Sequence, residues 1–204
     1  MDTINNYKKI VENSVLLLVA AVVGLIVSAV AQIFMIAAKN IFTFIFNNKD
    51  FEFTIEIGTF SLNLLPLLIC IPSSILVALL MYFLKLPRWF GPADTIFATH
   101  VRAGTLDIKG GFGSTLASFI SVCGGASVGV YGPLVHFGAT VSAFFRRLSF
   151  VPKIPHDIII GCGVAAAISA GFGAPLAGII FAHETVLRHF SMKAVTALAI
   201  SSMA

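Results

Sequence analysis

Charged side chains are scarce in this sequence. Lysine, arginine, aspartate and glutamate together make up 11% of the 204 residues, whereas hydrophobic residues make up 58%. A soluble domain carries about 25% charged residues, and so apolar a chain could not cover its surface with polar groups. The composition therefore excludes a disordered tail, argues against a soluble enzyme and favours a helical integral membrane protein. The net charge of +4 is too small to indicate a nucleic-acid partner.

Cysteine is also rare, and its three positions, Cys70, Cys123 and Cys162, all lie inside apolar runs. They form neither a CxxC pair nor a cysteine–histidine spacing of the kind that binds zinc. We therefore expect them to be small buried packing residues. The sequence predicts no metal site and no cofactor.

Two long apolar runs occupy the first part of the chain. Residues 15–38 carry no charge and are long enough to cross a hydrocarbon core of about 30 Å. The second run, at 58–84, contains Pro66 and Pro72, which predict a bent or late-starting helix. The segment 39–57, which contains charged residues, separates the two runs.

Basic residues are placed unevenly around these runs. Lys8 and Lys9 precede the first run, and Lys85 and Arg88 follow the second, whereas the stretch 40–57 between them is balanced to acidic. Because basic residues favour the cytoplasmic side, we expect the N-terminus to be cytoplasmic and the protein to lie in the inner or plasma membrane.

The predicted organisation is a cytoplasmic lead-in at 1–13 followed by one transmembrane domain at 14–204. After residue 90 the apolar segments become shorter and are broken by glycine and proline; they cover 111–127, 133–150, 155–171, 174–190 and 194–204. Short helices that end at membrane depth leave backbone groups that lipid cannot satisfy. Such segments are typical of transporters with an ion site near the midplane.

The stretch Gly129-Val130-Tyr131-Gly132-Pro133 separates two of these segments. Pro133 predicts a helix start, and the next amides, from Leu134 onwards, are expected to lack intrahelical partners. Free amides at the positive end of a helix form an anion site. The alternative is a purely structural kink.

A second helix start of the same kind is predicted at Phe172-Gly173-Ala174-Pro175. Two helix N-termini inside one bundle strengthen the case for an anion.

These two segments also carry a resemblance. SVGVYGPLVHFGA (127–139) and, about forty residues later, AAAISAGFGAPLAGIIFAHE (165–184) resemble the motifs of the CLC family of chloride channels and proton-coupled anion transporters. The likeness extends over about 90–204. It implies a CLC-type inverted-repeat fold, all-α and polytopic, of which this chain is the first half.

The departures from the family pattern concern its charged positions. The first motif has a gating glutamate where this chain has Tyr131, preceded by Val130 instead of a basic residue. Tyr131 is expected to donate a hydrogen bond to the anion or to block its path; the alternative is a packed aromatic ring. The family's inner proton-accepting glutamate corresponds to Thr185, beside the retained Glu184. Both carboxylates of the family's proton route are therefore missing.

A third family element has a serine before a Gly-Pro turn and a short helix. The nearest segment here, Arg88 to Pro92, keeps Gly91-Pro92 without the serine. The resemblance thus assigns the anion-binding positions to Gly129, Val130, Tyr131, Gly132, Pro133 and Leu134, together with Gly91 and Pro92.

The resemblance implies that this protein is no enzyme and carries a small anion, chloride first, across the bilayer by an uncoupled, channel-like route. One alternative is a secondary transporter coupled to protons or another ion. Another is a non-conducting subunit. A homodimer is implied, as is a missing C-terminal half, in the same natural chain or in another.

Overall fold

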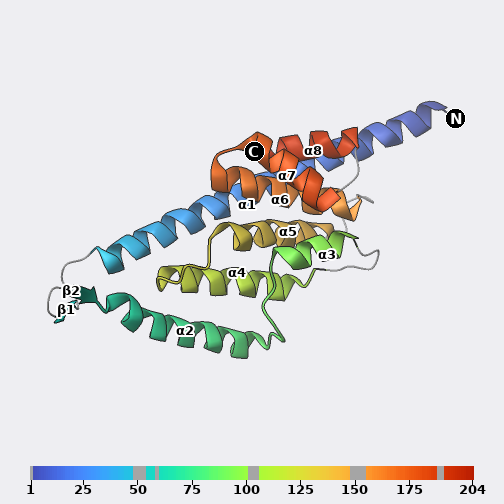
Figure 1. The fold of residues 1–204 in the computed structure, drawn as a ribbon. Coiled ribbons are helices and arrows are strands. Elements are labelled where there is room, and N and C mark those ends of the chain that lie inside the picture. Colours follow the sequence, from blue (N-terminus) through green and yellow to red (C-terminus); the bar gives the residue numbers. More distant parts are fainter. Residues whose placement is uncertain (1, 48–53, 58–59, 101–105, 148–154, 188–190) are drawn as a thin grey trace.

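The computed structural model is a bundle of helices with one small hairpin (Figure 1). It describes residues 2–47, 54–57, 60–100, 106–147, 155–187 and 191–204. Its elements are α1 (Asp2–Phe46), β1 (Thr54–Ile57), β2 (Phe60–Asn63), α2 (Leu65–Leu84), α3 (Pro92–His100), α4 (Ile108–Cys123), α5 (Tyr131–Arg147), α6 (His156–Phe172), α7 (Pro175–Phe181), the π-helix η2 (Ala182–Leu187) and α8 (Met192–Met203). The predicted all-α class is confirmed, with the antiparallel pair β1–β2 added between the first two helices.

Helix α1 is longer than the sequence indicated. It begins at Asp2 and ends at Phe46, so the expected lead-in at 1–13 forms its first turns, and Lys39 does not interrupt it. A single charged residue in a good helix-forming context is no helix breaker. At 1.5 Å per residue its 45 residues extend about 68 Å, more than twice the thickness of a hydrocarbon core.

One stripe of α1 is buried at a spacing of three or four residues, as expected for a helix that packs along one face. Its members are Leu16, Val19, Ala20, Val23, Val27, Ala31, Phe34 and Ala38. This stripe packs mainly against α6 and α8.

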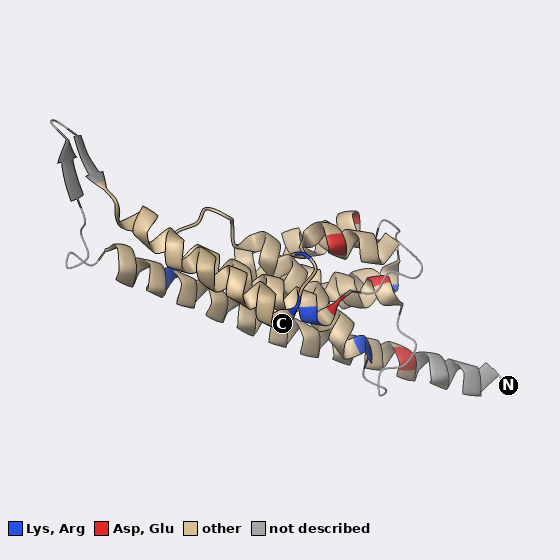
Figure 2. Cartoon of the chain, turned by 90° about the horizontal axis from the view of Figure 1, so that it is seen from below, with Lys and Arg blue, Asp and Glu red and all other residues tan. Residues whose placement is uncertain are grey.

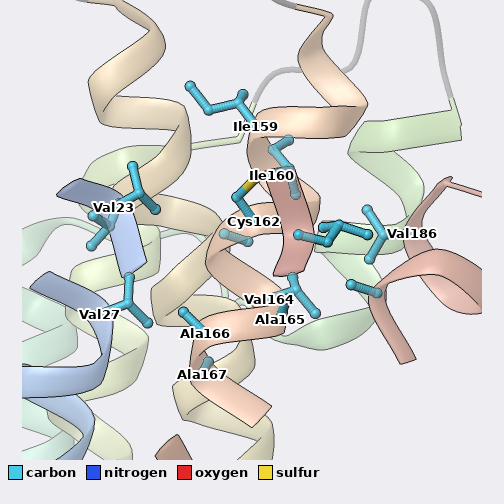
Figure 3. Packing of buried hydrophobic residues seen from close by; sticks show 14 of the residues in the cluster. Val23, Val27, Ile159, Ile160, Cys162, Val164, Ala165, Ala166, Ala167 and Val186 are labelled. Atoms are coloured by element: carbon cyan, nitrogen blue, oxygen red, sulfur yellow. The ribbon is translucent and has the colours of Figure 1, made fainter. Parts of the chain in front are cut away.

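Helix α6 is the centre of the bundle. Every residue from Ile158 to Ser169 is buried, and α6 contacts α1, α5, α7 and α8. Figure 3 shows Val23 and Val27 of α1 approaching the valine and alanine side chains of α6. On the other side, a Cβ added at Gly138 of α5 or at Gly163 of α6 would overlap the other residue's carbonyl. Only glycine allows these two backbones to cross so closely.

Helix α2 lies at the edge of the bundle, and Leu65 is its one buried residue. It starts at Leu65 with Pro66 in its first turn, which confirms the late start, and it continues through Pro72. Val11–Phe46 and Leu65–Leu84 are long and apolar enough to cross a membrane.

Two further expectations need correction. The segment 174–190 is not one α-helix, because α7 ends at Phe181 and a π-helical turn follows. Of the three cysteines only Cys162 is buried; Cys70 and Cys123 are half-buried.

Candidate functional site

The candidate site is built around the first turn of α5. The helix begins at Tyr131, two residues before the predicted start at Pro133, and Gly129 before it has φ +75°. The Leu134 N–H donates to the Val130 carbonyl at 3.4 Å. The prediction that this amide lacks an intrahelical partner is therefore wrong. Because Pro133 has no N–H, the amides that helix geometry leaves without intrahelical acceptors are those of Tyr131 and Gly132.

The Tyr131 ring lies against the end of α6. It stacks on Phe172 with the ring centroids 4.0 Å apart and the planes 17° from parallel. A Cβ at Gly171 would lie 3.0 Å from the Tyr131 ring, so the small residue makes room for it. The two rings remain 40% and 55% exposed. The sequence singled out Tyr131 and placed Phe172 in the second predicted helix start, but it did not predict that the two rings, 41 residues apart, stack on each other.

The second predicted helix start follows directly after this aromatic pair. Gly173 ends α6 with φ +63°, and α7 begins at Pro175. The Ser202 hydroxyl of α8 donates to the Pro175 carbonyl at 2.7 Å. The stacked rings therefore bring the starts of α5 and α7 to one region.

Gly91 and Pro92, at the start of α3, also lie in this region. Helix α3 begins at Pro92, whose Cγ would lie 3.5 Å from a Cβ at Gly132. The fold therefore gathers the separate segments to which the sequence assigned anion binding.

The start of α3 differs from the other two because an acidic residue caps it. Asp94 accepts a hydrogen bond from the Gly91 N–H at 2.8 Å and forms an ion pair with Arg88. The hydrogen bonds from Arg88 and Gly91 stabilise the ionised form of this carboxylate. An anion at the Gly91 amide would have to displace this carboxylate. The sequence analysis overlooked Asp94, although an acidic residue in a first helical turn is a capping signal.

His136 joins α3 to α5 inside the bundle. Its ring is 1% exposed, and Nδ1 lies 2.8 Å from the hydroxyl of Thr95, which is equally buried. Among the described residues its Nε2 has no hydrogen-bond partner. The neighbouring Thr140 donates to the His136 carbonyl at 2.7 Å. The ring thus fixes the first turn of α3 against α5.

Glu184 and Thr185 lie in η2. Glu184 is exposed, and the Thr185 hydroxyl donates to the Phe181 carbonyl at 2.6 Å. Thr185 therefore uses its donor on the last residue of α7, one turn before it.

Comparison with known proteins identifies the family. The model of the voltage-gated chloride channel family matches residues 75–204, more than half of the chain. The chain therefore belongs to this family of membrane proteins, and the resemblance carried by the two motifs is confirmed.

Individual relatives agree with the family match. A putative ClcB-like chloride channel protein of Ralstonia nicotianae is 30% identical over 129 residues, which cover 61% of this chain and 30% of that protein. The voltage-gated ClC-type chloride channel ClcB of Escherichia coli is 28% identical over 57% of this chain and 27% of its own length. The chain thus aligns with less than a third of these relatives.

The fold has a solved counterpart. The crystal structure of a slow cyanobacterial Cl⁻/H⁺ antiporter superposes with a TM-score of 0.71 and 20% identity. The match covers 93% of this chain and 44% of that one, as expected for a first half.

Replacing Thr95 by valine should lower the free energy of unfolding in detergent by about 1–3 kcal/mol. The substitution keeps the shape of the side chain but leaves the buried His136 Nδ1 without its partner. Thr95→Ser, which retains the hydroxyl, is the matched control and should lose less. Equal losses for the two variants would show that packing, not the hydrogen bond, matters there.

Proposed function

We propose that this chain forms one half of a membrane pathway for a small anion, with chloride as the first candidate, and that the pathway is not coupled to protons. The observation that carries the proposal is the place of Tyr131, a neutral side chain at the first residue of α5 beside the starts of α7 and α3.

The charges around the helix starts favour an anion. The first turns of α5 and α7 contain no acidic residue, so neither helix has a carboxylate of its own at its positive end. Partial charges on amides attract an anion without holding it as a buried lysine or arginine would. The start of α3 is compensated by Asp94, which makes the starts of α5 and α7 the better positions for an anion.

The neutral gate supports uncoupled movement. A phenol does not exchange protons near neutral pH as a carboxylate can, and it carries no negative charge to compete with the anion. Thr185 likewise has no acidic group: its hydroxyl is a hydrogen-bond donor, not a carboxylate that takes up and releases a proton. A proton route needs groups that bind and release protons along a path.

The stacked pair Tyr131–Phe172 gives the non-conducting alternative a physical basis. Two flat rings over the start of α5 restrict access to its amides, so a closed subunit is the second candidate. A coupled transporter that uses another route remains the third.

The rest of the assembly is part of the proposal. The chain covers less than a third of its curated relatives, so a second half is needed to complete the pathway, and a homodimer in the lipid bilayer of the inner or plasma membrane follows from the family. Figure 2 shows most of the Lys and Arg residues that it colours blue in the half of the molecule that carries the N-terminus. This supports a cytoplasmic N-terminus.

Anion efflux from liposomes containing the intact natural protein tests the proposal, with pH recorded at the same time. We expect chloride to leave the vesicles without stoichiometric proton movement. Proton movement in a fixed ratio would establish the coupled alternative. No flux at any voltage or pH would establish the closed subunit.

Tyr131→Glu should introduce pH-dependent flux that rises as the medium becomes more acidic. The ionised carboxylate occupies the helix start as an anion would, and protonation near its ordinary pKa of about 4.3, or somewhat above it, releases it. Tyr131→Phe adds no titrating group and serves as the control. An identical pH profile for wild type and the glutamate variant would place residue 131 off the pathway.

Phe172→Ala should increase flux by roughly two- to tenfold, the range that corresponds to the loss of one aromatic pair. Tyr131→Ala should have a similar effect, and the double variant should gain little more because either change removes the same stack. Phe83→Ala removes an exposed ring from the end of α2, at the edge of the bundle, and should leave flux unchanged. Additive gains would contradict a shared closure.

A further inference from the structure

A basic pocket lies at the opposite end of α5 from Tyr131, where α5 ends and α4 and α6 begin. It has a volume of about 240 Å³ and is lined by Leu106, Ala143, Arg146, Arg147 and His156. The two arginines form the last turn of α5 and are exposed. The pocket therefore combines three nitrogen-rich side chains with two apolar ones.

A second hollow continues from the first along α4. Its volume is about 510 Å³, and Asp107, Ile108, Lys109, Phe144 and Arg147 line it. Arg147 belongs to both linings, so the two hollows share one guanidinium. Together they present the cations Arg146, Arg147 and Lys109.

The acidic groups nearby do not cancel these charges. The Asp107 carboxylate accepts from the Lys109 N–H at 3.1 Å and thereby caps α4. Asp157, in the first turn of α6, interacts electrostatically with His156. Three cations and a histidine thus face two carboxylates, one of which is engaged as a helix cap.

The donors suit a phosphate group. A guanidinium presents five N–H donors in a planar fork that matches phosphate oxygens. Arg147 donates one of them to the Leu106 carbonyl at 3.3 Å, which holds its side chain in place and leaves other donors for a ligand. The histidine offers a further ring nitrogen at the same pocket.

The apolar side chains along the second hollow favour the phosphate of a lipid over a free phosphate ion. Phe144 is 46% exposed at the second hollow. From Ile108 the exposed side chains of Phe112 and Leu116 follow at intervals of four on one face of α4. If the headgroup of a lipid bound to the arginines, its acyl chain could lie against these apolar side chains along α4.

We propose that the pocket between the end of α5 and the starts of α4 and α6 binds the phosphate of an anionic phospholipid headgroup, with its acyl chain along Phe144 and the exposed face of α4. Basic pockets at helix ends in membrane proteins are suited to anionic headgroups. The site is separate from the region of Tyr131 and does not depend on the proposed transport function.

Native mass spectrometry of the purified intact protein can count the lipids that it retains. Phosphatidylglycerol should remain bound to the wild type more strongly than phosphatidylcholine of the same chain length. Arg146→Gln should reduce the retained phosphatidylglycerol by about fivefold, the effect of one basic residue at an anionic surface. This variant keeps the bond between Arg147 and Leu106, so the fold at the pocket is preserved.

Lys193→Gln is the matched control, because it removes one exposed cation from α8 that lines neither hollow. An equal loss of lipid for Lys193→Gln and Arg146→Gln would overturn the proposal in favour of general charge attraction. Equal retention of phosphatidylcholine and phosphatidylglycerol would overturn it as well. Displacement of the lipid by millimolar inorganic phosphate would replace the lipid by a free phosphate as the ligand.

Arg147→Lys provides a second variant with the charge unchanged. A lysine ammonium lacks the planar fork, so retention should fall although the net charge is the same. Retention equal to wild type would contradict a site built on guanidinium geometry. Both variants are scored by bound lipid alone, whether or not the protein conducts anions.

Discussion

The backbone groups at helix ends are the constraint on which this structure depends. A helix that stops inside an apolar bundle leaves carbonyls and amides that lipid cannot satisfy. Polar side chains of neighbouring helices supply partners for main-chain groups inside the bundle. Gln32 of α1 donates to the Ala170 carbonyl in the last turn of α6 at 3.0 Å, and Ser169 of α6 donates to the Ser202 carbonyl in the last turn of α8 at 2.6 Å. The few polar residues of an apolar chain are thus placed where backbone groups need partners.

The same constraint separates the three helix starts near Tyr131. Asp94 compensates the start of α3 from within the chain, whereas the first turns of α5 and α7 contain no acidic residue. An uncompensated helix start in a low-dielectric setting attracts a negative partner more strongly than it would in water. The position of the Asp94 carboxylate therefore distinguishes the start of α3 from the starts of α5 and α7.

Composition and motifs predicted the class of fold and the regions of the site, because they depend on hydropathy and on glycine–proline punctuation. They did not predict the register of α5: Pro133 suggested the helix start, but the chain enters the helix at Tyr131 and the Leu134 amide is bonded. Proline is compatible with any position in a first turn, so it marks the turn and not its first residue. The pairing of Phe172 with Tyr131 and that of Thr95 with His136 were not predicted for another reason, since the partners lie about forty residues apart and no local pattern links them.

The glycine crossing of α5 and α6 has a consequence for movement. Where Gly138 and Gly163 bring the two backbones together, neither helix can slide or rotate without a clash between main chains. The crossing therefore holds the middle of α5 against α6, whereas the stacked rings of Tyr131 and Phe172, at the helix ends, are exposed. An opening that turns those rings needs rotamer changes of the kind that take picoseconds to nanoseconds at exposed positions, whereas a shift of whole helices takes microseconds or longer. In a pathway built in this way, the rate of opening would be set by side-chain rotation and not by the movement of whole helices.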